Sequence, residues 1–185
     1  NGPFVWPGSK DNIAALHRIG DRRKVEEKIK LSHHVTTFEF NISKVTACPI
    51  EMRNSIGIVD SDEQYCLITS AQSPYAVQTE LAQLFKVDEK KIRVIAPDVG
   101  GSFGMKGGLF REDALVLWAS KRLKRPVCWL CERSEAFLSD EYARAVSGSA
   151  SLGLDDNGNF TSLWVDAYID AGAYLSRRTK SLVNN

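Results

Sequence analysis

Residues 92–108 read Ile-Arg-Val-Ile-Ala-Pro-Asp-Val-Gly-Gly-Ser-Phe-Gly-Met-Lys-Gly-Gly, an apolar strand pattern that runs into a loop with five glycines in nine residues. Glycine has no side chain, so such a loop lets backbone N–H groups approach a bound group closely. The spacing differs from that of the common nucleotide-binding loops. The Walker loop requires Gly-Lys-Ser/Thr, but Lys106 follows Met105, and no Gly-x-Gly-x-x-Gly occurs from Gly100 to Gly108. A phosphate or nucleotide site on this loop therefore stays a minor alternative.

The residues on either side of the loop predict strands that alternate with helices. Ser73 suits a helix N-cap and Pro74 the first helical position, and the apolar residues that follow recur with helical spacing. Further helices are expected at 21–30 and 109–123, and strands at 35–45, 55–59, 64–70, 91–96, 126–131 and 160–168. This succession predicts an α+β fold, with helices packed on a mixed β-sheet, as a single unit over 1–185.

Length and composition exclude several classes of protein. The 185 residues carry a formal net charge of +1, with 43% hydrophobic and 25% charged residues, which is ordinary for a globular domain. That charge gives no reason to expect nucleic acid or an anionic membrane as partner. The chain begins at Asn1 without an initiator methionine or a signal sequence, so we expect it to be cut from a longer polypeptide.

The cysteines and the charged residues near the loop suggest no metal site. Cys128 and Cys131 form a single Cys-x-x-Cys in a short apolar run, without the second pair or the histidines that a zinc site needs. They are expected to be buried strand residues. Lys106 and Arg111 could reach a ligand, but the expected outcome for both is a solvated surface charge.

Several blocks of the sequence together resemble a known family, the molybdopterin-binding large subunits of xanthine dehydrogenases, aldehyde oxidases and carbon monoxide dehydrogenase-like enzymes. The blocks are residues 69–74 (Thr-Ser-Ala-Gln-Ser-Pro), 92–106 and 124–127 (Lys-Arg-Pro-Val), supported by 49–53 and 170–174. The resemblance covers about residues 12–174. It implies that the chain is the N-terminal portion of a molybdopterin-cofactor-binding domain, and an incomplete one.

The resemblance also implies a chemistry. Members of this family hold molybdenum through the dithiolene of a pterin, and they oxidise an aldehyde or similar small substrate with oxygen derived from water. The implied cofactor is molybdopterin with Mo, and both the plain pterin and its cytosine dinucleotide form stay open. The implied partners are iron–sulfur and FAD-containing flavin subunits or domains of the same complex. A cytoplasmic location is implied, with neither nucleic acid nor membrane as partner.

Five residues of this sequence stand at the family's cofactor-binding positions. Gln72 aligns with a glutamine that donates a hydrogen bond to the apical oxo ligand of molybdenum. Gly101, Ser102, Phe103 and Gly104 align with backbone amides and an aromatic ring beside the pterin. A neutral amide can tune a metal from outside its ligand shell without adding charge. On the residues alone, Gln72 could instead cap the following helix, and Phe103 could be a core residue.

The chain departs from the family pattern at several points. Ser102 replaces a common glycine, which would cost about 1 kcal/mol if the position requires a positive φ. Gly107 replaces the substrate-binding glutamate of purine-hydroxylating members, so xanthine is an unfavoured substrate. The family's catalytic glutamate segment has no match between Tyr174 and Asn185, so we expect no catalytic residue in this chain. Two hypotheses follow: a piece of a molybdenum hydroxylase, or a non-catalytic remnant that binds no cofactor.

Overall fold

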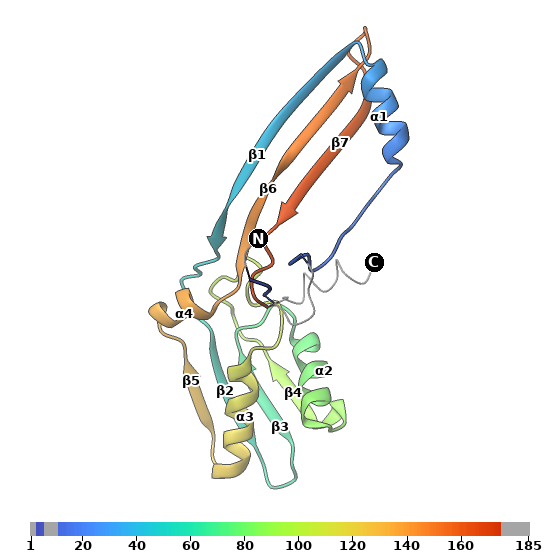
Figure 1. The fold of residues 1–185 in the computed structure, drawn as a ribbon. Coiled ribbons are helices and arrows are strands. Elements are labelled where there is room, and N and C mark those ends of the chain that lie inside the picture. The colour runs from blue at the N-terminus through green and yellow to red at the C-terminus, as the bar shows by residue number, and fades with distance from the viewer. Residues whose placement is uncertain (1–2, 6–10, 175–185) are drawn as a thin grey trace. The chain divides into compact units, whose positions relative to one another are not determined.

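The computed structural model describes residues 3–5 and 11–174. The chain divides into two compact units, one formed by residues 46–142 and the other by the flanking segments 1–45 and 143–185 (Figure 1). The expectation of one unit over 1–185 stays a prediction, and each unit is described by itself. No helix within the described residues is long and apolar enough to cross a membrane.

The unit of residues 46–142 is built on a four-stranded sheet with the strand order β4-β3-β2-β5. The strands β2 (Asn54–Val59) and β3 (Tyr65–Thr69) form the expected antiparallel hairpin, and β5 (Val127–Leu130) pairs antiparallel with β2. The strand β4 (Ile92–Ile95) runs parallel to β3. The predicted mixed sheet is therefore confirmed.

Helices connect and cover the strands of this sheet. Helix α2 (Pro74–Phe85) and the short 3₁₀ helix η1 (Glu89–Lys91) link β3 to β4, as a parallel strand pair requires. Ser73 is the N-cap of α2, as expected, although its side chain makes no capping hydrogen bond. Helix α3 (Arg111–Leu123) follows the glycine loop and begins two residues later than expected. The short helix α4 (Arg133–Ser139) was not predicted.

The core of this unit lies between the sheet and the helices α2 and α3. Its buried members are apolar side chains of β3, β4, both helices and the connection from β3 to α2: Tyr65, Leu67, Ala71, Val77, Leu81, Ala82, Ile92, Val116 and Leu117. Gly57 of β2 lies directly under α3, because a Cβ built on it would be 2.5 Å from the carbonyl carbon of Val116. Sheet and helix therefore touch there through their backbones.

The unit of the flanking segments is a three-stranded antiparallel arrangement with a helix against it. Its sheet has the order β1-β6-β7, with β1 (His34–Thr46), β6 (Tyr142–Leu154) and β7 (Phe160–Ile169). Helix α1 (Arg22–Leu31) lies along β7, as Figure 1 shows. Asp21 accepts hydrogen bonds from the first backbone amides of α1 and so caps it.

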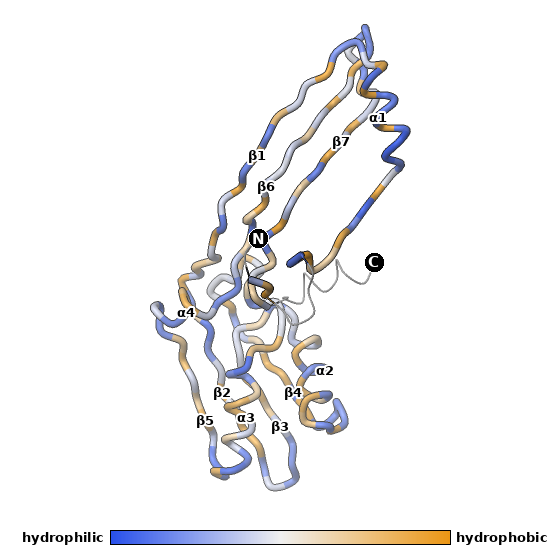
Figure 2. The backbone as a smooth tube through the Cα atoms, viewed as in Figure 1, coloured by the Kyte–Doolittle hydropathy of each residue, from blue (hydrophilic) through white to orange (hydrophobic). Residues whose placement is uncertain are grey.

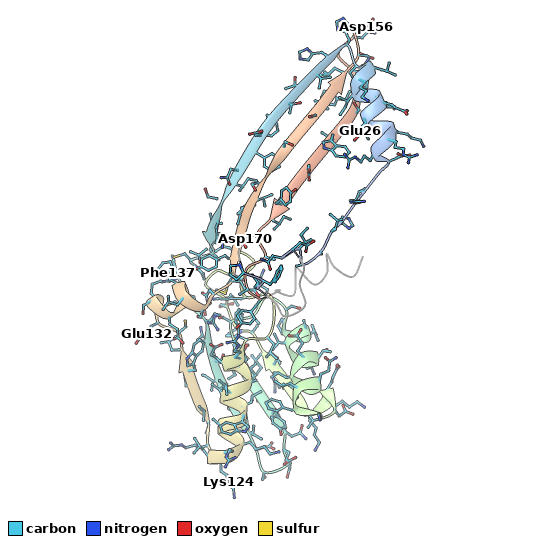
Figure 3. The ribbon with its side chains drawn as sticks, viewed as in Figure 1. Glu26, Lys124, Glu132, Phe137, Asp156 and Asp170 are labelled. Carbon is cyan, nitrogen blue, oxygen red and sulfur yellow. The ribbon has the colours of Figure 1, made fainter. Side chains whose placement is uncertain are left out.

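The apolar side of β1 is more exposed than the alternating sequence suggests. Phe38 and Ile42 alternate with polar residues, a pattern typical of a half-buried strand, but the two side chains are 58% and 45% exposed. Figure 2 shows hydrophobic and hydrophilic residues alternating along the strands of this sheet. The arginine at the start of α1, Arg22, stacks over Trp164 at 5.1 Å and pairs with Glu26. Figure 3 labels Glu26 on this helix. The alternating pattern identifies which side chains share a face of the sheet, but it does not show whether another layer of structure covers that face.

Candidate functional site

The topology of the sheet brings Gln72 and the glycine loop together. Gln72 follows the end of β3, and the loop follows the end of β4. These two strands are parallel neighbours, so their carboxyl ends lie at the same edge of the sheet. The backbone N–H of Gln72 donates to the carbonyl oxygen of Lys106 at 2.9 Å, and a Cβ on Gly107 would lie 3.7 Å from Gln72 Oε1.

The side chain of Gln72 is free to meet a ligand. It is exposed, and its carboxamide has no hydrogen-bond partner among the described residues. It does not cap α2, whose N-cap is Ser73. The alternative role considered for Gln72 on the residues alone, as a helix cap, is therefore wrong.

The loop uses three left-handed backbone positions, and Ser102 is not one of them. Gly101 has φ +98° and Gly104 φ +92°, where glycine carries no steric cost, whereas Phe103 has φ +52°. The cost of about 1 kcal/mol that a positive φ would impose on Ser102 therefore does not arise. The strained position is Phe103.

Ser102 instead closes a turn within the loop. Its hydroxyl oxygen accepts the backbone N–H of Lys106 at 2.9 Å, and its carbonyl oxygen accepts that of Met105 at 3.0 Å. The residue is buried. A glycine at this position could not make the first of these bonds, so the serine adds a hydrogen bond that holds the turn.

We expect Ser102→Ala to lower the free energy of unfolding by about 1–3 kcal/mol, since it leaves the buried N–H of Lys106 without its acceptor. Urea titration followed by tryptophan fluorescence measures this loss. Ser73→Ala is the matched control, because the Ser73 side chain makes no capping bond. An equal change in both variants would contradict the role assigned to Ser102.

Phe103 is a surface residue. Its side chain is 77% exposed, so the alternative of a core phenylalanine is wrong. A Cβ on Gly101 would lie 3.3 Å from the Phe103 ring and 3.4 Å from Cβ of Pro49. The absence of a side chain at Gly101 therefore makes room for the ring. The loop thus presents an aromatic surface beside its backbone.

Backbone donors accompany this ring. Within the described chain, the N–H groups of Gly101, Ser102 and Phe103 have no hydrogen-bond acceptor, whereas that of Gly100 is bound by Glu51 Oε2 at 2.8 Å. Unpaired backbone donors in a loop of left-handed turns form a concavity suited to oxygen atoms of a ligand. The loop and Gln72 together offer donors of the same, uncharged kind.

Lys106 departs from the expected solvated charge. Its side chain is fully buried, and its Nζ donates to the carbonyl oxygen of Glu51 at 2.9 Å and to Glu51 Oε2 at 2.8 Å. Burial acts to raise the pKa of the Glu51 carboxyl, but hydrogen bonds from Lys106, Gly100 and Asn54 outweigh it, and the pKa lies below its usual range. Glu51 is therefore a carboxylate that accepts from both ends of the loop.

Arg53 anchors the same segment from its other side. Its guanidinium is buried and donates to Asp140 at 2.6 Å and to Glu112 at 2.8 Å. It also lies over the rings of Phe110 and Trp129, at 4.3 and 5.1 Å. These contacts connect the segment before β2 with α3 and α4. The sequence marked residues 49–53 as a block, but it assigned no role to Glu51 or Arg53.

Asp113 fixes the start of α3, directly behind the loop. Its buried carboxylate accepts the hydroxyls of Ser55 and Thr69 and the backbone N–H of Phe110. Burial raises the pKa of this carboxyl, and the three hydrogen bonds oppose the rise only in part. The loop is therefore held between β4 and a helix that is tied to β2 and β3.

No protein side chains gather to hold a metal ion in the described part of the chain, where no group of three or more His, Cys, Asp or Glu residues occurs. All four cysteines are free thiols. Cys131 is buried as expected, and burial raises the pKa of its thiol to about 11. Cys128 is exposed, contrary to expectation, since β5 is an edge strand whose side chains alternate in exposure.

Comparisons with known proteins agree on one family. The model of the molybdopterin cofactor-binding domain matches residues 5–185. The nicotine 6-hydroxylase large subunit of Paenarthrobacter nicotinovorans is 31% identical over 94% of this chain and 21% of its own length. The carbon monoxide dehydrogenase large chain of Hydrogenophaga pseudoflava is 32% identical over 94% of this chain and 20% of its own length.

Solved structures agree with these sequences. Quinoline 2-oxidoreductase from Pseudomonas putida 86 superposes with a TM-score of 0.76 at 34% identity, covering 81% of this chain and 19% of its own. Carbon monoxide dehydrogenase from Oligotropha carboxidovorans gives a TM-score of 0.77 at 26% identity, covering 82% and 19%. The chain thus spans about a fifth of the length of the proteins it matches.

Proposed function

Because this chain belongs to the molybdopterin cofactor-binding domain family, we propose that it supplies one wall of the cofactor site in a molybdenum hydroxylase large subunit. The observation that carries the proposal is the meeting of Gln72 with the glycine loop at one edge of the sheet. Among the described residues, the Gln72 carboxamide and the N–H groups of Gly101, Ser102 and Phe103 are unpaired, uncharged donors. Such donors suit a large planar cofactor that brings its own metal.

The residues proposed to hold the cofactor are those expected from the sequence. The side-chain amide of Gln72 would donate a hydrogen bond to the cofactor on its metal side, and the backbone amides of Gly101, Ser102, Phe103 and Gly104 would hold its pterin. The exposed ring of Phe103 adds an aromatic surface. When bound, the cofactor supplies the two-electron redox chemistry of molybdenum. The residues of this chain orient it and exclude water from one side.

The reaction proposed for the whole protein is oxidation of a small substrate with oxygen derived from water. An aldehyde is the first candidate substrate. The names of the nicotine 6-hydroxylase and quinoline 2-oxidoreductase relatives favour a second candidate, a nitrogen-containing aromatic ring. Gly107 leaves the space beside Gln72 free of a side chain. Steady-state rates with a panel of aldehydes and N-heteroaromatic compounds separate the two classes.

Other parts of the assembly complete this proposal. Electrons leave through iron–sulfur and FAD-containing partners, and a glutamate from another segment of the large subunit acts as catalytic base. The cofactor is molybdopterin or its cytosine dinucleotide, and the complex works in the cytoplasm. The competing proposal is a structural remnant that binds no cofactor.

Metal and pterin analysis decides between these two proposals. We expect about one molybdenum per polypeptide when the natural polypeptide containing this chain is purified, with its partners, from a host that makes the cofactor. Release of the pterin by acid and its detection by fluorescence identify which form is bound. Absence of molybdenum under these conditions would leave the remnant as the better description.

Gln72→Ala is expected to lower the rate of substrate oxidation per molybdenum by about 10–100-fold, the usual effect of removing a partner outside the metal's ligand shell. Folding should be unchanged, because the side chain is exposed and has no partner in the described chain. Gln83→Ala, at an exposed position on α2, is the control. Equal rates in the two variants would remove Gln72 from the proposed site.

A further inference from the structure

One buried lysine joins the three segments that surround the proposed site. The Nζ of Lys106 donates to the main chain and side chain of Glu51, in the segment before β2. Its carbonyl oxygen accepts the N–H of Gln72, after β3. Its own N–H donates to Ser102, in the glycine loop. Main-chain and side-chain groups of a single residue therefore set the spacing of all three segments.

Glu51 completes the junction from the other end of the loop. Its Oε2 accepts both Lys106 Nζ and the N–H of Gly100, and its own N–H donates to the carbonyl oxygen of Gly100 at 3.2 Å. A Cβ on Gly100 would lie 2.6 Å from Cβ of Glu51, so the two segments are in close contact. Gly100 and Lys106, at the two ends of the turn, are thus held by the same carboxylate.

The burial of Lys106 argues against the two roles that a lysine beside a binding loop usually has. Its side chain is 0% exposed, so it is not a solvated surface charge. Its ammonium group already donates to two oxygen atoms at 2.8 and 2.9 Å, and it lies on the Glu51 side of the loop. It is therefore not placed as a direct ligand contact.

We infer that Lys106 and Glu51 are positioning residues of the proposed cofactor site, which hold the Gln72 segment and the glycine loop in one register. The contacts above support the positioning role by themselves, whereas its effect on cofactor binding rests on the proposed function. A buried ion pair adds little stability over well-packed apolar residues of similar volume. The apolar pair could not supply the bonds of Lys106 Nζ to Glu51 or of the Gly100 N–H to Glu51 Oε2, whereas the main-chain bonds of residue 106 to Gln72 and Ser102 would remain.

The decisive variant is the double replacement Glu51→Leu with Lys106→Met, made in the natural polypeptide that contains this chain. It removes both charges together, so it avoids the unpaired ammonium that replacing Glu51 alone would leave in the interior. The proposal expects a midpoint of thermal unfolding close to that of the unaltered protein, but faster hydrogen exchange at the amides of residues 100–106. An acceleration of at least tenfold is expected in protein prepared without cofactor.

Three further variants separate positioning from general stability. Glu51→Gln keeps a side-chain oxygen that can accept a hydrogen bond, so we expect it to restore most of the protection that Glu51→Ala loses. Lys121→Met removes a surface lysine that pairs with Glu63, and it should leave exchange in the loop unchanged. Unaltered exchange at residues 100–106 in the double variant, or equal exchange in Glu51→Gln and Glu51→Ala, would overturn the inference.

Molybdenum content links the junction to function. In a host that makes the cofactor, the double variant is expected to retain less than a tenth of the molybdenum held by the unaltered protein and by Lys121→Met. Full molybdenum content in the double variant would overturn the link. If the unaltered protein itself binds no molybdenum, the proposed function fails, whereas the exchange measurement still decides the positioning role.

Discussion

Gly57→Val is expected to prevent the unit of residues 46–142 from folding stably. A Cβ at this position would lie 2.5 Å from the carbonyl carbon of Val116, 2.6 Å from the nitrogen of Leu117 and 2.7 Å from the oxygen of Val116. All three atoms belong to the backbone of α3, so no change of rotamer relieves the contact. Overpacking a core costs about 1–3 kcal/mol when side chains can adjust, and we expect the upper end or more here.

The measurement is the soluble yield of the variant and its midpoint of urea unfolding. Gly158→Ala is the control, because a Cβ at Gly158 meets nothing within 4 Å, although the residue has φ +81°. It isolates the cost of losing a glycine from the cost of separating β2 and α3. A Gly57→Val protein as stable as Gly158→Ala would show that α3 moves away without penalty, contrary to the packing described above.

Arg53→Met is expected to lower the free energy of unfolding by about 3–5 kcal/mol, the usual cost of leaving a buried partner uncompensated. The arginine is 4% exposed and pairs with Asp140 and Glu112. Methionine retains much of the apolar contact with Phe110 and Trp129, so the loss should come chiefly from the two carboxylates. Denaturant titration of both proteins measures the difference.

The matched control for Arg53 is the pair of Lys121 with Glu63. These side chains are 45% and 52% exposed and their charged atoms lie 2.7 Å apart, a contact as short as those of Arg53. Solvent screens exposed pairs, so Lys121→Met should change stability little. The contrast tests burial rather than distance as the source of the effect. Similar losses in both variants would contradict it.

The sequence predicted the parts of the fold that depend on local patterns. Helix α2 was predicted because Ser73, Pro74 and a helical apolar spacing act within one short segment, and the structure confirms it. The hairpin of β2 and β3 follows from alternation on either side of a polar turn. The mixed sheet followed from the order of strands and helices, because β3 and β4 are joined through a helix.

The features that the sequence did not predict depend on residues far apart in the chain. The burial of Lys106 requires Glu51, and the burial of Arg53 requires Asp140. No local pattern marks these pairs. Helix α4 is only seven residues long, too short for apolar periodicity to identify it. The left-handed position at Phe103 rather than Ser102 is local, since it accompanies the turn that Ser102 closes with Lys106, but no residue type in the loop marks it.

The sequence predicted which residues form the proposed site, but not the buried contacts that hold them in place. Gln72 and the loop were named from the resemblance, and the parallel pair β3 and β4 gives the physical reason why they meet. Their roles toward a cofactor stay predictions. The junction beneath them became visible only with the side chains in place, because the sequence favoured a solvated surface charge for Lys106 over a ligand contact, and the buried side chain has neither role.

The anchoring of α3 by Asp113 has a consequence for the thermodynamics of ligand binding. Its carboxylate ties the helix start to Ser55 and Thr69, while β4 holds the other end of the glycine loop. The chain between these two fixed points therefore loses most of its conformational freedom when the unit folds, before any ligand arrives. Preorganised donors leave little ordering entropy to be lost on association. A ligand that uses these amides should bind with a smaller entropic penalty than it would on a free glycine-rich chain.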